Sequence, residues 1–173
     1  FVGFKYFIRF FDSPDFWRLI TNTLTVSLYS LVVGFPLPIL MALLLNQCSA
    51  GRFKKTVQNV IYAPHFVSTV VLVGMMNVMF SVNSGVINAI IGALGGTPTL
   101  FMGSPTAFPH MYVWSGVWQN MGWNSIIYFA ALSGVSQDLH DAAIVDGANK
   151  LQRIRYIDLP TIVPTIMIML VLQ

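Results

Sequence analysis

The sequence predicts an all-α integral membrane protein, and two observations carry that prediction. Hydrophobic residues make up 55% of the chain and charged residues only 9%, whereas about a quarter of an average soluble domain is charged. In addition, the residues from Thr56 to Gln137 contain no Lys, Arg, Asp or Glu. A soluble domain must solvate its surface, so an uncharged stretch of this length favours burial in a bilayer.

The basic balance of the chain does not indicate a nucleic-acid partner. The net charge is +3, but the basic residues flank apolar stretches, as they do at the cytoplasmic ends of membrane helices. The chain begins with Phe1 and stops inside an apolar run at Gln173. We therefore expect residues 1–173 to be one transmembrane domain, a fragment incomplete at both ends.

The first segment predicts a short helix in the bilayer interface, because apolar side chains recur on one helical face. These are Phe1, Phe4, Phe7, Ile8 and Phe11.

Four stretches are apolar and long enough to cross a membrane or to begin doing so. The first runs from about Thr23 to Leu45, and we expect Pro36 and Pro38 to kink it. The others are about Ile61–Phe80, Pro109–Val135 and Ile162–Leu172. We therefore expect a kinked bundle with about four transmembrane helices.

The loops predict the orientation of this bundle. Segments 46–56 and 136–160 each hold three basic residues, whereas 81–107 holds none and contains a short apolar piece, Val86–Leu94. The positive-inside bias then puts 46–56 and 136–160 in the cytoplasm and 1–20 and 81–107 outside. An external N-terminal segment implies at least one further span upstream.

Between the last two spans lies a charged segment whose pattern predicts two short helices. Asp138 is placed to cap the first helix, with Asp141 returning a bond to its backbone. Gly147 is suited to a left-handed stop. A second helix with Lys150 follows, and Pro160 marks the return to the membrane. So much ordered polar sequence between two spans favours a knob that docks a soluble protein.

The spacing within this segment resembles one family. The chain reads Asp141-Ala142-Ala143, three residues, Gly147, nine residues, then Ile157-Asp158-Leu159-Pro160. This resembles the cytoplasmic signature of the membrane permease subunits of binding-protein-dependent ABC importers, Glu-Ala-Ala, three residues, Gly, nine residues, Ile-x-Leu-Pro. Asp141 in place of Glu is the one departure. Asp146-Gly147-Ala148 is similar to the form found in carbohydrate importers.

The resemblance implies a type I importer (MetI-like) helix bundle in the bacterial cytoplasmic membrane, without a cofactor. Its partners would be ABC ATPase subunits, a second homologous permease that we expect to form a heterodimer, and an extracytoplasmic solute-binding protein. Segment 34–46 is similar to the subgroup that serves oligosaccharide or polysaccharide importers with a lipoprotein binding protein. Segment 136–160 would be the coupling loop, with ATPase contacts from Asp141, Ala142, Ala143, Asp146, Gly147, Ile157, Leu159 and Pro160.

The solute path is predicted from the third span, where amides and aromatic side chains share a helical face. Sugars are bound by hydrogen bonds and by aromatic stacking, so we expect contributions from Gln119, Asn120, Trp123, Asn124 and Tyr128. The alternative is equally open: the Trp side chains form an interface belt and the Asn side chains bond between helices.

Two other functions compete with an importer subunit. A secondary transporter or channel for a neutral solute is the first, although such proteins often carry ionisable groups inside the membrane and the four predicted spans have none. A membrane hydrolase is the second, but His65, His110 and His140 are far apart in the chain and form no metal or nucleophile pattern. No Gly-x-x-x-x-Gly-Lys occurs, so we expect no enzyme here and the ATPase in a separate chain.

Overall fold

A computed structural model describes residues 2–48 and 51–173, and over those residues the chain is all-α, as predicted. Phe1 of the predicted interface helix and residues 49–50 of the basic loop lie outside the described residues. The elements are α1 (Lys5–Phe11), α2 (Asp15–Gly34), α3 (Pro36–Asn46), α4 (Gly51–Tyr62), η1 (Ala63–Phe66), α5 (Thr69–Met79), α6 (Val86–Ala93), α7 (Phe108–Leu132), α8 (Gln137–Val145), α9 (Lys150–Arg153), η2 (Ile154–Asp158) and α10 (Leu159–Leu172).

The first span is one helix of 32 residues, Asp15–Asn46, made of α2 and α3. It starts earlier than predicted. The backbone at Phe35, between the two elements, keeps helical angles of φ −77° and ψ −44°. The prolines lie in the first turn of α3, where a missing N–H is tolerated. They therefore interrupt the hydrogen-bond ladder locally while the span continues.

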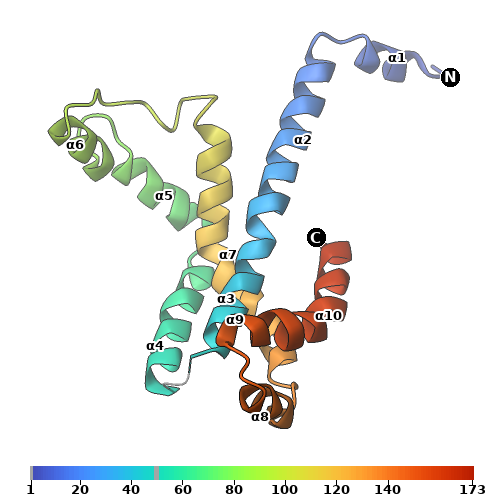
Figure 1. The fold of residues 1–173 in the computed structure, drawn as a ribbon. Helices are drawn as coiled ribbons and strands as arrows, with labels where there is room; N and C mark the ends of the chain where they lie inside the picture. The colour runs from blue at the N-terminus through green and yellow to red at the C-terminus, as the bar shows by residue number, and fades with distance from the viewer. Residues whose placement is uncertain (1, 49–50) are drawn as a thin grey trace.

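The span predicted over Ile61–Phe80 is not one continuous helix. The chain instead bends by 97° between Gly51–Phe66 and Thr69–Met79. Pro64 lies in the short 3₁₀ segment η1, and Val67 is extended (φ −78°, ψ 126°). Ser68 then starts α5 afresh by accepting a hydrogen bond from Val71 N. An extended pair of residues cannot continue a helix, so α5 leaves in a new direction (Figure 1).

The third predicted span corresponds to α7, which has 25 residues and is long enough to cross the hydrocarbon layer. In the described part of the chain, two helices are long and apolar enough to cross a membrane, Asp15–Asn46 and Lys150–Leu172, and the bent pair counts as a third only when its two halves are taken as one broken span. The amides and the histidine of α7 lower its hydropathy, so it is not among them.

The last predicted span needs a correction. It does not begin at Ile162 after a separate short helix, because α9, η2 and α10 form one helix of 23 residues, Lys150–Leu172. The five residues of η2 form a π-helical turn inside it. The helix therefore includes Asp158, whose side chain is fully buried.

The apolar core lies where α3, α7 and α10 meet. It is formed by Ile39, Ala42, Leu43, Tyr128, Leu132 and Ile162.

A second close contact joins α7 to the end of α4. A Cβ on Gly122 would overlap the carbonyl oxygen of Ile61, so only glycine allows this approach. At the other end of α4, the Lys54 ammonium lies 4.3 Å from the centre of the Phe129 ring.

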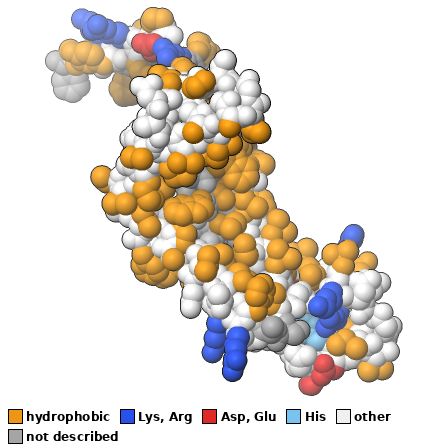
Figure 2. Space-filling model, turned by 90° about the vertical axis from the view of Figure 1, so that its left-hand side faces the viewer, with side chains coloured by type: hydrophobic (Ala, Val, Ile, Leu, Met, Phe, Trp, Pro, Cys, Tyr) orange, Lys and Arg blue, Asp and Glu red, His pale blue; other side chains and the backbone are white. Residues whose placement is uncertain are grey.

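The two ends of the molecule bear different segments of the chain. Helices α1 and α6 lie at one end, and α8 lies with the start of α4 at the other (Figure 1). Figure 2 shows apolar side chains over the middle of one face, with Lys and Arg toward its two ends. Segment 136–160 and the described part of 46–56 therefore share one end.

The close contact at Gly122 gives the first prediction. Gly122→Ala should destabilise the protein by about 1–3 kcal/mol, because the new methyl group must displace the backbone at Ile61. Gly116→Ala is the matched control on the same helix, since a Cβ there meets nothing within 4 Å. The melting temperature of the protein in detergent measures both. An unchanged melting temperature for Gly122→Ala would contradict the predicted clash.

Candidate coupling surface and solute path

Helix α8 begins earlier than the predicted cap. Ser136 is its N-cap, with an extended backbone and a side chain that accepts a hydrogen bond from Asp138 N at 3.3 Å. The prediction that Asp138 caps the helix is therefore wrong, because Asp138 already lies in the first turn. The Asp141 carboxylate instead accepts a bond of 3.1 Å from Gln137 Nε2. This bond joins side chains one helical turn apart.

The stop at Gly147 is confirmed. Its φ is +81°, which glycine adopts without strain. The N–H of Ala148 bonds the carbonyl of Ala143 at 2.8 Å and the N–H of Gly147 bonds that of Ile144 at 3.0 Å, the pattern of a Schellman motif. A Cβ on Gly147 would meet nothing within 4 Å, so the requirement for glycine comes from the backbone alone.

Helix α9 has a capping box that the sequence reasoning missed. The Asn149 side chain accepts a bond of 2.9 Å from Gln152 N, and the Gln152 side chain accepts one of 2.8 Å from Asn149 N. The sequence pattern of this capping box is Asn-x-x-Gln, two residues after the glycine stop. With Gly147, this box fixes the turn between α8 and α9, so the segment is a folded knob.

Most of the predicted coupling residues lie on the surface. Ala143 and Ile157 are half-buried, and the other six are exposed: Asp141, Ala142, Asp146, Gly147, Leu159 and Pro160. Beside them lies an exposed apolar patch, which we call the knob tip, formed by Ile144, Val145, Leu151 and Tyr156. The sequence reasoning selected the small and acidic residues but missed this patch.

The knob tip has the chemistry of an interface. Val145 is 86% exposed, and large apolar side chains clustered on a charged segment mark protein contact sites. A shallow depression of about 220 Å³ lies next to it, lined by Asp146, Gly147, Ala148, Gln152 and Tyr156.

A buried carboxylate lies behind the knob. Asp158 accepts hydrogen bonds from Gln47 Nε2 at 2.8 Å and from Asn46 Nδ2 at 3.3 Å. His140 Nε2 of α8 is also 3.3 Å from one of its oxygens. We call these four residues the Asp158 cluster. Sequence reasoning placed Asp158 at the variable position of the signature and gave it no role.

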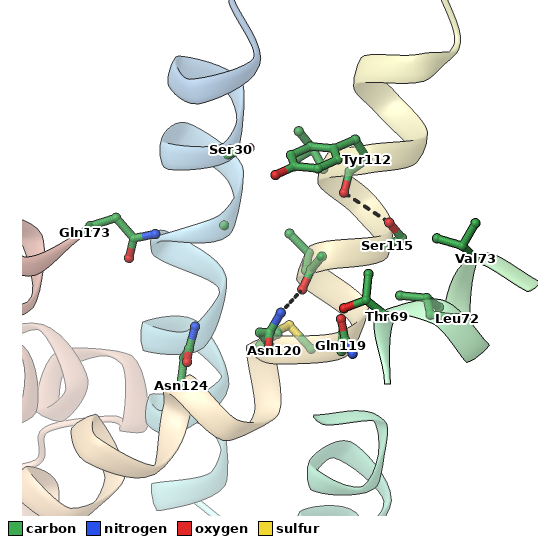
Figure 3. Close-up of a pocket in the computed structure, with 15 residues that line it drawn as sticks. Ser30, Thr69, Leu72, Val73, Tyr112, Ser115, Gln119, Asn120, Asn124 and Gln173 are labelled. Atoms are coloured by element: carbon green, nitrogen blue, oxygen red, sulfur yellow. Dashed lines mark hydrogen bonds between the residues drawn. The ribbon is translucent and has the colours of Figure 1, made fainter. Parts of the chain in front are cut away.

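The predicted solute path corresponds to a cavity of about 620 Å³ between α2, α5 and α7. Figure 3 shows side chains from these three helices around it. Three of the five predicted residues line it: Gln119, Asn120 and Asn124. Its other polar lining side chains include those of Ser30, Thr69, Tyr112 and Ser115, and none of the described lining residues carries a formal charge.

Two of these amides also hold the bend between α4 and α5. Gln119 Nε2 donates to the carbonyl of Val67, the extended residue at the bend. Asn120 Oδ1 lies 3.1 Å from His65 Nδ1, and its Nδ2 donates to Gly116 O. Asn124 lines the cavity and shows no side-chain hydrogen bond to any described residue.

The remaining two predicted residues do not line the cavity. Trp123 stacks on His65 with ring centres 4.5 Å apart and planes 4° from parallel. Tyr128 is only 2% exposed and belongs to the apolar core. The alternative of interhelical bonding thus describes part of what α7 does, since Asn120 and Trp123 both contact His65.

Comparison with known proteins agrees with this architecture. Residues 28–173 match the family described as "Binding-protein-dependent transport system inner membrane component". Among curated relatives, the chain is 42% identical to Protein LplB of Bacillus subtilis (strain 168) over 172 residues. It is 41% identical over 172 residues to the polygalacturonan/rhamnogalacturonan transport system permease protein YteP of the same organism. Each alignment covers 99% of this chain and 54% of the relative, so the chain spans about half their length.

Among solved structures, the chain is similar to a bacterial ABC transporter involved in the import of the acidic polysaccharide alginate. The TM-score is 0.96 with 40% identity, covering 99% of this chain and 60% of that chain. A bacterial alginate ABC transporter in complex with alginate pentasaccharide-bound periplasmic protein matches with a TM-score of 0.95. Both the family match and the 42% identical relative cover most of the chain. This chain therefore belongs to the family of inner membrane components of binding-protein-dependent transport systems.

Proposed function

We propose that the chain is part of a permease subunit of an ATP-driven importer, in which it forms one side of the path for a sugar or oligosaccharide. The observation that carries this proposal is the folded knob of residues 136–160, which has the importer signature and lies at the same end of the molecule as the start of α4. Family membership supports this proposal over the alternative of a secondary transporter or channel. Residues 1–173 would belong to one transmembrane domain, with 136–160 as its coupling loop.

The knob would seat on a separate ATPase at the cytoplasmic side. The knob tip supplies apolar area, and Asp141 and Asp146 supply charge at its rim. The capping box and the Gly147 turn hold these groups in a fixed geometry. A preformed surface of this kind binds without first paying the entropy of ordering a loop. Closure of the ATPase would then move the knob and, with it, the attached spans.

The cavity between α2, α5 and α7 would form one wall of the solute path. Its hydroxyl and amide groups suit a polyhydroxylated solute, since each can exchange a hydrogen bond with water for one with a sugar. Several relatives support this class by name: they are permease proteins for polygalacturonan/rhamnogalacturonan, trehalose/maltose and arabinooligosaccharides.

The partners follow from the same assignment. A second homologous permease would close the other side of the path, and an extracytoplasmic binding protein would deliver the solute. The exposed apolar faces of α5 and α10 are available to lipid and to the second permease. The end that bears α1 and α6 would face the binding protein, with residues 1–20 and 81–107 outside and 46–56 and 136–160 inside.

The coupling proposal predicts that Gly147→Asp abolishes transport while the protein stays in the membrane. Any side chain at φ +81° is strained by about 1–2 kcal/mol, and the added carboxylate adjoins the depression beside the knob tip. A bulky residue at Ala143 should act in the same way. Co-purification with the ATPase measures the loss of docking that should cause the loss of transport. Gly95→Asp is the matched control, since Gly95 has φ +84° and lies at the opposite end. Normal ATPase association of the Gly147 variant would contradict the proposed docking.

The path proposal predicts that Asn124→Ala lowers the maximal uptake rate roughly fivefold, which corresponds to the loss of about one hydrogen bond to the solute. Asn120→Ala should also lower it, but with a loss of stability because His65 loses its partner. Uptake of alginate pentasaccharide, oligogalacturonides and trehalose would be measured in reconstituted vesicles. Asn77→Ala is the control, an exposed amide on α5 that does not line the cavity. Unchanged uptake of every sugar by Asn124→Ala would remove this residue from the path.

A further inference from the structure

The Asp158 cluster joins three segments that are far apart in the sequence. Asn46 and Gln47 come from the end of the first span, His140 from α8 of the knob, and Asp158 from the helix that runs into the last span. Asp158 is fully buried, and His140 is 9% exposed. The cluster is therefore the polar contact through which the knob is attached to two membrane helices.

The attachment depends on the buried carboxylate of Asp158, because its partners come from other segments of the chain. A buried carboxylate requires polar partners on its oxygens, and here Asn46 and Gln47 donate hydrogen bonds from the end of the first span, while His140 Nε2 of α8 lies 3.3 Å from one oxygen. Separation of α8 from the bundle would leave the carboxylate without His140. Separation of the first span would leave it without both amides. Among the residues that the structure describes, His140–Asp158 is the one pair in which a histidine or basic side chain lies within 4 Å of a carboxylate.

Asp158 also lies at an unusual place in its helix. It is the last residue of the π-helical turn η2, where the helix changes its hydrogen-bond pattern before α10. Such turns inside α-helices are found most often at functional sites. The π turn sets where Asp158 faces, because an extra residue per turn shifts the side chain around the helix axis.

We propose that Asp158 and His140 are positioning residues that fix the knob to the spans, so that movement imposed on the knob by the ATPase reaches the solute path. This inference rests on the proposed function. Neither residue contacts the ATPase in this account. Without the cluster, the knob would still dock and ATP would still be hydrolysed, but α8 would turn against the bundle and the spans would not follow.

The test uses the assembled importer with Asp158→Asn, His140→Ala and His140→Gln. The asparagine has only one acceptor oxygen and directs an NH₂ group at other donors. The amide introduced by His140→Gln can replace the imidazole Nε2 as a donor, so this variant is the conservative rescue. Asp138→Asn is the matched control, the same change at an exposed position on α8. Two quantities are measured: sugar taken up per ATP hydrolysed, with the three sugars above, and the spin-label distance between Leu139 of α8 and Leu44, both exposed, with Cys48 replaced by serine.

Asp158→Asn and His140→Ala should lower uptake per ATP by at least about fivefold, with a broadened Leu139–Leu44 distance distribution and normal assembly with the ATPase. His140→Gln should restore most of the uptake per ATP and most of the narrow distance distribution. Asp138→Asn should change neither quantity. The inference is overturned if uptake per ATP and the distance distribution stay normal in Asp158→Asn, or if that variant fails to assemble. A wild-type complex that imports none of the sugars would contradict the proposed function instead, while the distance measurement would still test the cluster.

Discussion

The structure depends on how one buried carboxylate is satisfied. Asp158 lies at zero exposure inside the helix that continues into the last span, and an unpaired polar group there would cost about 1–3 kcal/mol or more. Its three partners come from the end of the first span and from α8, so the pairing that removes this cost also fixes the first span, the knob and the last span together. The apolar core begins beside it, with Ile162 one helical turn further on and Leu43 close to Asn46. Polar and apolar packing therefore meet at the end of the bundle that bears the knob.

The middle of the molecule is organised around helix α7. Helix α7 packs against α2, α3, α4 and α10, and it uses its two halves differently. Toward the knob it contributes Tyr128 and Leu132 to the core. Further along, its amides line the cavity and hold the bend after α4, and Gly122 lets the chain at Ile61 approach its backbone. One helix thus connects the end that bears the knob to the cavity, which is what the proposed transmission of movement between them requires.

The sequence predicted the class of fold, the sidedness and the knob, because composition, loop charge and a spaced signature are local or global features that need no contact information. Its errors share a cause. The break at Val67 and Ser68, the burial of Asp158 and the loss of Trp123 and Tyr128 from the cavity all depend on side chains distant in sequence: Gln119 bonds Val67, Asn46 and Gln47 bond Asp158, and His65 stacks on Trp123. Hydropathy treats a residue as buried or exposed and cannot identify its partner. The missed cap at Ser136 and the box at Asn149 were readable locally, since each polar residue directly precedes its helix.

The central claim is that the knob formed by residues 136–160 contacts the ATPase. Photo-cross-linking tests it most directly, with a benzoylphenylalanine at Val145 on the knob tip and another at Leu94 at the opposite end of the molecule. Both positions are more than four-fifths exposed, so reactivity and access are matched. The account predicts a cross-link from Val145 to the ATPase subunit in the assembled importer and none from Leu94. Absence of the Val145 cross-link in a complex that hydrolyses ATP, or an equal yield from both positions, would contradict it.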